Sequence, residues 1–327
     1  MLETVAPAPV SLSALGDQPR LSEPKHARRA RFHQSWYRAV QLGVPGWGKT
    51  PMGRPLGSIL PVAAAAAGRN FTSPEAEAMF VKRRTLGWGV DPIRMTSHMT
   101  SSQALLMNLF GPLADDPDWL LEILRVVLAR PDLIVVLDVA VEFAPPKRSH
   151  YLGDMTRVDA FVKLAAADGV EGLVLELKYT DRFSSRRLPL SESPRYRDLA
   201  ESTDLWKSPD HAFSDGSVSQ LLRCHALGVR TLEVDLEATL PVTLLLVHHP
   251  LDMDAGSVLD EYRRQLTNPD LATRVDLGCL LQTALASAPG IEQARGIREL
   301  QLRYLRLEES EALWHENLVA AHPTKRR

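Results

Sequence analysis

The sequence VDAFVKLAAADGVEGLVLELKYTD, residues 158–181, contains two short apolar segments that carry charged side chains at intervals. Their length and their content of valine, leucine and phenylalanine are typical of β-strands, and the glycines of Gly169-Val-Glu-Gly172 indicate a turn between them. We therefore predict strands over residues 157–164 and 172–179. Because the connection is short, the two strands should pair in an antiparallel hairpin.

Three charged residues of this hairpin, Asp159, Glu176 and Lys178, carry the chemical signal. Glu176 and Lys178 are two residues apart, so their side chains point to the same face of the strand. Charged groups on a central strand are costly unless they are paired or bound, and Asp159 can supply a second carboxylate from the neighbouring strand. Two carboxylates offer hard oxygen ligands to Mg²⁺ or Mn²⁺, and a lysine beside them can position or deprotonate a water molecule and offset phosphoryl charge. The alternative is an ordinary charged pair on an exposed strand face.

Outward from the hairpin, the pattern predicts the rest of a mixed α/β fold. Residues 133–143 should add a third strand to an antiparallel meander, and residues 240–247 should join the sheet after a helix over 216–227 that ends at Gly228. Further helices are predicted over 25–38, 74–86, 101–113 with a stop at Gly111-Pro112, 117–128, 257–266 and 292–321. Residues 43–72 are predicted to be an extended wrap and 180–209 a polar loop. The result is a central sheet flanked by helices.

The composition excludes several classes of protein. The 327 residues include 38 Lys+Arg and 40 Asp+Glu, which makes no general case for nucleic acid but permits a local basic groove. The two cysteines, Cys224 and Cys279, lack C-x-x-C spacing, so a disulfide framework and a thiolate zinc site are not expected. The first twenty residues lack the order of a signal peptide, and no apolar run has the length of a membrane span. We expect a cytoplasmic protein without a membrane partner.

A second motif, GVPGWGKT from Gly43 to Thr50, matches the spacing of a phosphate-binding loop. Such a loop needs a buried strand before it and a helix after it. Here the preceding residues have helical character and the following ones contain two prolines and two glycines, while Pro45 removes an amide that the loop would need. We interpret the segment as a glycine-rich wrap with an exposed lysine, and a nucleotide-binding protein that uses Gly43 to Thr50 remains the alternative.

The pattern of Asp159 followed by Glu176-Leu177-Lys178 resembles the PD-(D/E)XK, or restriction-endonuclease-like, nuclease superfamily, with Val158 in place of the motif's proline. Gln220-Leu-Leu-Arg223 falls on the next helix, where that superfamily often has a glutamine or a basic residue. Segments at 70–71, 91–94 and 101–110 resemble a little-characterised bacterial branch of restriction-type nucleases. The resemblance covers about residues 30–250. It implies a restriction-endonuclease-like core and a metal-dependent DNA nuclease that uses metal-activated water, with restriction or phage defence as the corresponding role.

The resemblance also implies roles for individual residues. Asp159, Glu176, Lys178 and Gln220 are the predicted catalytic residues, and Asp159 and Glu176 the predicted ligands of Mg²⁺ or Mn²⁺. Glu142 and Glu122 compete for a further acidic position, of which Glu142 is the predicted metal ligand. The predicted DNA-binding residues are the arginines beyond the lysine and on the next helix, namely Arg182, Arg186, Arg187 and Arg223.

Four parts of the chain are predicted. Residues 1–24 form a flexible arm, 25–95 an N-terminal helical and extended extension packed on the core, 96–290 the nuclease core, and 291–327 a C-terminal helix and basic tail. DNA is the predicted partner, and assembly is expected either as a homodimer or with a protein of a defence system. A catalytically inactive DNA-binding protein on the same fold is the second alternative, and the presence of all three catalytic residue types argues against it.

Overall fold

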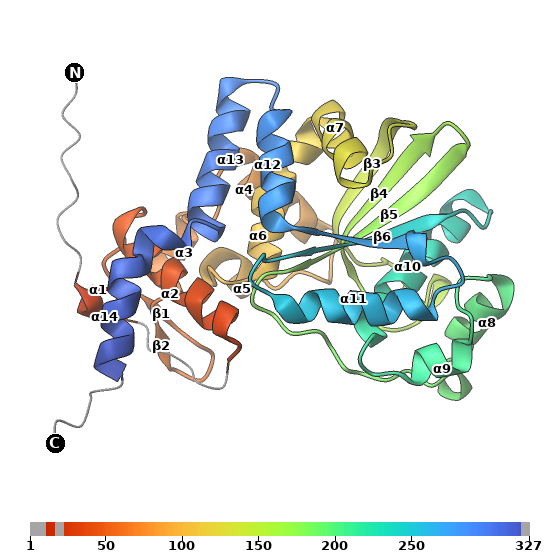
Figure 1. Cartoon of the computed structure of the whole chain (residues 1–327), viewed down its shortest axis with the longest axis horizontal. Coiled ribbons are helices and arrows are strands. Elements are labelled where there is room, and N and C mark those ends of the chain that lie inside the picture. The colour runs from red at the N-terminus through yellow and green to blue at the C-terminus, as the bar shows by residue number, and fades with distance from the viewer. Residues whose placement is uncertain (1–10, 17–22, 322–327) are drawn as a thin grey trace.

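The structure is a computed structural model that describes residues 11–16 and 23–321. At its centre lies one five-stranded mixed sheet with the strand order β3-β4-β5-β6-β7 (Figure 1). The strands are β3 (Leu133–Phe143), β4 (Val158–Ala166), β5 (Gly169–Lys178), β6 (Val242–His248) and β7 (Ala272–Asp276). β3, β4 and β5 form an antiparallel meander, and β6 and β7 add parallel to β5. The predicted α/β class, the meander and the later strand are confirmed.

The turn of the β4–β5 hairpin differs from the prediction. Ala167 and Asp168 form it, and Ala166 pairs directly with Gly169, so that the glycines of residues 169–172 lie within β5. Gly169 follows the turn at a φ of 130°, which glycine adopts without the strain that a side chain would cause. Gly169 is thus the first residue of β5, and the turn of the hairpin is shorter than predicted.

Helices cover both faces of the sheet. Successive side chains of β5 point to opposite faces, and the residues from Gly172 to Lys178 are all buried, so both faces must be covered. Leu173, Leu175 and Leu177 pack into one core with α6 (Ser102–Asp115), α7 (Pro117–Val127) and α12 (Leu277–Ala286). On the other face Val174 contributes to a second core. That core is covered by α8 (Pro194–Ser202), α9 (Pro209–Ser214), α10 (Ser219–Leu236) and α11 (Met253–Gln265). Glu176 and Lys178 follow the periodicity of Val174, so they face α10.

The N-terminal third of the chain packs against the C-terminal helices (Figure 1). It consists of α1 (Leu12–Leu15), α2 (Lys25–Val40), β1 (Gly48–Lys49), β2 (Pro55–Leu56), α3 (Val62–Ala66), α4 (Pro74–Thr85) and α5 (Pro92–Ser97). Its C-terminal partners are α13 (Ile291–Tyr304), a short 3₁₀ turn (Leu307–Ser310) and α14 (Glu311–Ala321). The buried His33 of α2 contacts the Leu302 carbonyl and the Ser310 hydroxyl, each at 2.9 Å. These contacts support the proposal that residues 25–95 are an extension rather than a separate domain.

The ends of the chain differ in detail from the prediction. Of the predicted arm, residues 1–10 and 17–22 lie outside the described residues, but Leu15 of α1 is buried and its carbonyl accepts a hydrogen bond from Arg38. The described part of the arm is therefore anchored. The predicted C-terminal helix is two helices, α13 and α14, and the basic tail after residue 321 lies outside the described residues.

Two glycines predicted to end helices instead allow close packing. α6 continues through Gly111 and Pro112, and α10 continues through Gly228. A Cβ on Gly111 would lie 2.5 Å from backbone atoms of Ala76 in α4, and one on Gly228 would lie 2.3 Å from the Val174 side chain. Both predictions of a helix end were wrong, because at these positions a neighbouring element leaves no room for a side chain.

Other elements were missed or extended. α8 lies within residues 180–209, which were predicted as loop, and α3 lies within the predicted wrap of 43–72. Neither β7 nor α12 was predicted, and the helix predicted over 257–266 begins at Met253, where Asp252 accepts hydrogen bonds from the amides of Asp254 and Ala255. Among the described residues, no helix combines the length and apolar character that crossing a membrane requires.

The segment from Gly43 to Thr50 does not form a phosphate-binding loop. It follows helix α2, and its residues Gly48 and Lys49 form β1, which pairs with β2. The Gly48 amide donates to the Ile59 carbonyl at 2.7 Å, while the carbonyls of Val44 and Gly46 accept from Arg38. Two of its carbonyls contact a buried guanidinium, and the amides of Val44, Gly48 and Thr50 donate to backbone carbonyls, so these groups do not converge on a phosphate site.

The histidine at the N- and C-terminal junction makes stability depend on pH. Burial is the main cause that lowers the pKa of His33 to about 4. The unfolded chain then binds a proton that the folded state rejects, so the contribution is complete above about pH 6.5 and is lost as pH falls toward 4, by up to about 3 kcal/mol. Urea unfolding at pH 7 and pH 4.5 should show a weaker pH dependence for His33→Gln than for wild type. The exposed control His211→Gln should keep the wild-type pH dependence, and an unchanged dependence in His33→Gln would contradict the assignment.

Candidate active site

Strands β4 and β5 bring the two predicted carboxylates to one place. Ala160 pairs with Leu175, so Asp159 and Glu176 lie at the same level on neighbouring strands. Oδ2 of Asp159 accepts a hydrogen bond from the amide of Leu177 at 2.6 Å, which fixes it between the positions of Glu176 and Lys178. The short hairpin sets this register; the alternation of β5 turns Glu176 toward α10, and Asp159, which stands opposite it on β4, faces the same side.

Glu176 is buried and held on both carboxylate oxygens. Its Oε1 lies 2.7 Å from Nζ of Lys178 and accepts a hydrogen bond from Nε2 of Gln220 at 2.6 Å. Its Oε2 accepts from the Cys224 thiol at 3.4 Å. Gln220 also accepts from the Ser184 amide at 2.7 Å, so it links Glu176 to the loop after β5. The predicted catalytic glutamine therefore contacts the predicted glutamate directly.

Lys178 carries a positive charge in these surroundings. Burial alone lowers the pKa of its ammonium, but the charges of Glu176 and Asp159 and the hydrogen bond to Glu176 outweigh burial, so the pKa lies above its ordinary value. The ammonium also lies 5.0 Å from the centre of the Phe183 ring, where a cation is stabilised further. Among the roles predicted for this lysine, charge compensation fits the structure better than removal of a proton.

The carboxylates repel one another. The pKa of Asp159 is raised well above its ordinary value, first by desolvation and then by the charges of Glu176 and Glu142, which exceed the opposing effects of Lys178 and the Leu177 amide. A bound cation would relieve this repulsion. The site thus has an excess of negative charge that one lysine does not neutralise.

Glu142 lies at the end of β3 and completes the acidic surroundings. It is buried at a φ of 50°, and its Oε2 accepts from Nε2 of Gln103 on α6 at 2.6 Å. Arg157 approaches the same oxygen at 4.0 Å, whereas Oε1 has no hydrogen-bond partner among the described residues. Burial is the main cause that raises the pKa of Glu142 to about 7.

The side chains of Asp159, Glu176 and Glu142 fit a hard divalent cation in chemical type, since all offer carboxylate oxygens. One of these oxygens, on Glu142, has no hydrogen-bond partner among the described residues. In the part of the chain that the structure describes, however, no three His, Cys, Asp or Glu side chains are close enough to share one ion. Asp159 and Glu176 as a pair of metal ligands, with water and substrate oxygens in the other positions, stay a prediction. Glu142 as a third ligand remains a prediction.

The predicted DNA-binding arginines lie around the loop after β5 and on α10. Arg182, Arg186 and Arg187 are exposed. Nε of Arg223 donates a hydrogen bond to the Ser219 carbonyl at 3.2 Å, one helical turn earlier on α10. Nη2 of Arg223 also donates to the Ser184 hydroxyl at 3.2 Å. Because Ser184 is also bonded to Gln220, this basic segment is fixed beside Glu176.

Sequence reasoning missed two residues at the site. Cys224 follows Gln220 by four residues and therefore lies on the same helix face, a spacing that could have identified it. Arg157 precedes Asp159 by two residues, so the alternation of a strand could have placed it on the same side. Glu122, the alternative to Glu142, is exposed on α7 and pairs with Arg125 at 2.5 Å.

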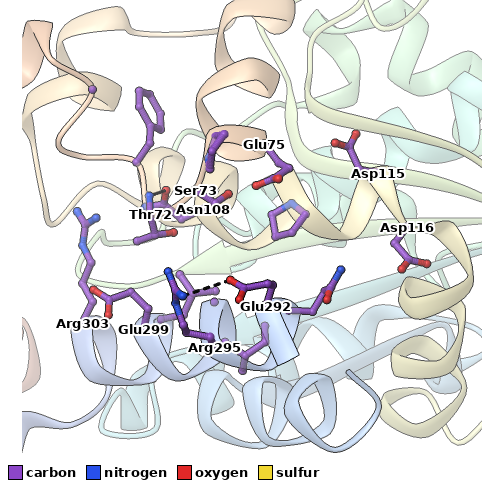
Figure 2. Close-up of a pocket in the computed structure, with 18 of the residues that line it drawn as sticks. Thr72, Ser73, Glu75, Asn108, Asp115, Asp116, Glu292, Arg295, Glu299 and Arg303 are labelled. Carbon is purple, nitrogen blue, oxygen red and sulfur yellow. Dashed lines mark hydrogen bonds and ion pairs between the residues drawn. The ribbon is translucent and has the colours of Figure 1, made fainter. Parts of the chain in front are cut away.

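A separate cavity of about 680 Å³ lies away from this site, between α13 and the residues that precede α4 (Figure 2). It is lined by acidic and basic side chains together, including Glu75, Asp115, Arg295 and Arg303. None of the predicted catalytic, metal-binding or DNA-binding residues, all of which the structure describes, lines it. The cavity therefore belongs to the junction of the N- and C-terminal parts and not to the carboxylate site.

An aspartate beside a Glu-x-Lys strand on a mixed sheet, under a helix that presents a glutamine, defines a restriction-endonuclease-like protein. The family model of the PD-(D/E)XK nuclease superfamily matches residues 21–306. The chain belongs to this superfamily. Among the curated proteins and the solved structures, none matches the chain.

Proposed function

We propose that the protein is a metal-dependent deoxyribonuclease that hydrolyses phosphodiester bonds. The observation that carries the proposal is the contact of Lys178 with Glu176 at 2.7 Å, beside Asp159 on the neighbouring strand. A Mg²⁺ or Mn²⁺ ion held by Asp159 and Glu176 would supply Lewis acidity and an activated water. The charged Lys178 offsets negative charge that develops on the phosphoryl group, and Gln220 keeps Glu176 in place.

DNA is the proposed substrate because the exposed arginines follow directly on the catalytic strand. Guanidinium groups bind backbone phosphates without reading sequence, which suits a nuclease channel. Restriction or phage defence in the cytoplasm is part of the same proposal, with assembly either as a homodimer or with a protein of a defence system. The inactive alternative is disfavoured, since the aspartate, glutamate and lysine are all present and adjacent.

The decisive experiment is incubation of the purified protein with plasmid and linear DNA. Cleavage is expected with Mg²⁺ or Mn²⁺ and should stop when EDTA is added. The Lys178→Ala variant, prepared in parallel, excludes a contaminating nuclease. If the wild-type protein binds DNA and Mn²⁺ without cutting either substrate, the inactive DNA-binding alternative replaces the proposal.

The exposed arginines should determine the salt dependence of DNA binding. Replacing Arg186 or Arg187 with alanine is expected to weaken binding similarly for all DNA sequences and to reduce the slope of log K against log [salt] by about 1 each. Fluorescence anisotropy from 50 to about 200 mM salt measures this slope. Arg298→Ala, an exposed arginine on α13, is the matched control and should leave the slope unchanged. Equal slopes for all three variants would place the DNA elsewhere.

A further inference from the structure

Helix α10 presents two side chains to Glu176, one helical turn apart. Gln220 donates to Oε1 at 2.6 Å, and Cys224 approaches Oε2 at 3.4 Å. Residues at this spacing lie on one face of a helix, so a single rigid element contacts both oxygens of the carboxylate. Lys178 adds a further contact to Oε1 only.

The Cys224 thiol has one proton to donate, and both groups within its reach are acceptors. Sγ of Cys224 lies 3.4 Å from Oε2 of Glu176 and 3.6 Å from the Arg157 carbonyl, and both of these groups are acceptors. No other hydrogen-bond donor from the described residues reaches Oε2 of Glu176. The side chains of Cys224 and Glu176 are both buried. A small donor at this position therefore satisfies an oxygen that would otherwise be buried without a partner.

We propose that Cys224 is a positioning residue of the nuclease site: its thiol and the Gln220 amide together fix the plane of the Glu176 carboxylate. Two contacts on two different oxygens prevent rotation of the carboxylate about its last bond, which a single contact would permit. The orientation of a metal ligand is commonly set by such outer contacts, and their removal costs about 10–100-fold in metal affinity or activity. The catalytic consequence rests on the proposed function, because it requires Glu176 to be a metal ligand.

The contact itself can be tested without metal or DNA. The sequence has two cysteines, so Cys279→Ser leaves Cys224 as the one thiol, and Cys279 is exposed and far along the chain from the site. The infrared S–H stretching band of this variant should lie at the low frequency of a hydrogen-bonded thiol. Adding Glu176→Gln should move it upward, since a neutral amide oxygen is a weaker acceptor than a carboxylate. A band that Glu176→Gln does not move would overturn the proposal.

The consequence for the site is tested with three substitutions of Cys224. Cys224→Ser keeps a donor, whereas Cys224→Val keeps approximately the volume without a donor, and Cys224→Ala keeps neither. We expect Mn²⁺ affinity and kcat about tenfold or more below wild type for valine and alanine, with rescue by serine and with KM for DNA unchanged.

A merely structural cysteine would give the opposite pattern. Thermal unfolding would then follow side-chain volume, with valine close to wild type, while Mn²⁺ affinity and kcat stayed level across the series. That result, or a serine variant as impaired as alanine while still folded, would overturn the proposal. If the wild type neither binds Mn²⁺ nor cleaves DNA, the proposed function fails, whereas the infrared band still decides whether Cys224 holds Glu176.

Discussion

Replacing Lys178 with alanine is expected to slow DNA cleavage by about 10²–10³-fold, the loss typical of one electrostatic stabiliser. The ammonium is buried, contacts Glu176 at 2.7 Å and stays charged because of Glu176 and Asp159. Without it, charge that develops on the phosphoryl group has no cation from this strand to offset it. Mn²⁺ binding should persist, since both carboxylates proposed as ligands remain and Gln220 still holds Glu176.

The substitutions Asp159→Asn and Glu176→Gln should behave differently from Lys178→Ala. Each keeps the shape of the side chain but removes a negative charge from a site for a hard cation, so Mn²⁺ affinity and cleavage should fall together while DNA binding persists or tightens. Calorimetry with Mn²⁺ and gel assays of cleavage separate these effects. Lys163→Ala is the matched control, because Lys163 forms an ion pair with Asp235 and not with Asp159 or Glu176. If all three site variants cleave DNA like wild type, the chemistry lies elsewhere.

Replacing Arg303 with alanine is expected to lower the free energy of unfolding by about 3–5 kcal/mol. The side chain is fully buried, donates to the backbone carbonyl of Asn70 at 2.8 Å and to its side-chain oxygen, and lies 5.0 Å and 5.4 Å from the ring centres of Tyr304 and Tyr37. Truncation leaves a cavity and buried acceptors without a donor. Urea denaturation followed by circular dichroism measures the loss.

Arg298→Ala is the control for Arg303→Ala. Arg298 lies on the same helix α13 but is exposed, so its removal should change the free energy of unfolding by no more than about 0.5 kcal/mol. Near-equal stabilities of the two variants would show that the Arg303 contacts contribute little. Cleavage per folded molecule should stay close to wild type in both, since neither arginine is at the carboxylate site.

The central strands could be predicted because their pattern is local. Apolar residues around Glu176 and Lys178 identify a buried strand, and the short connection to Asp159 fixes its neighbour, so the acidic pair follows from the sequence alone. The prediction of Gln220 as a site residue came from the family resemblance. The contact of Gln220 with Glu176 forms because α10 packs on the sheet, and this long-range packing cannot be read from a local stretch of sequence.

The elements that were missed depend on distant partners. β7 is a short strand, ATRVD, with a single buried residue, and it exists because it pairs in parallel with β6. Glycine commonly ends helices, yet Gly111 and Gly228 lie within helices where another element packs closely against the helix backbone. A sequence pattern does not distinguish a glycine that ends a helix from one that admits a neighbour.

The junction between α2 and α13 also has a consequence for synthesis of the chain on the ribosome. His33 and Arg29 are translated early, but their partner Ser310 is separated from them by 277 and 281 residues. Until that later segment leaves the exit tunnel, His33 and Arg29 lack their contacts with Ser310, so this face of α2 should reach its final packing after the central sheet. A stop codon shortly after residue 290 would therefore leave Arg29 and His33 of α2 without Ser310.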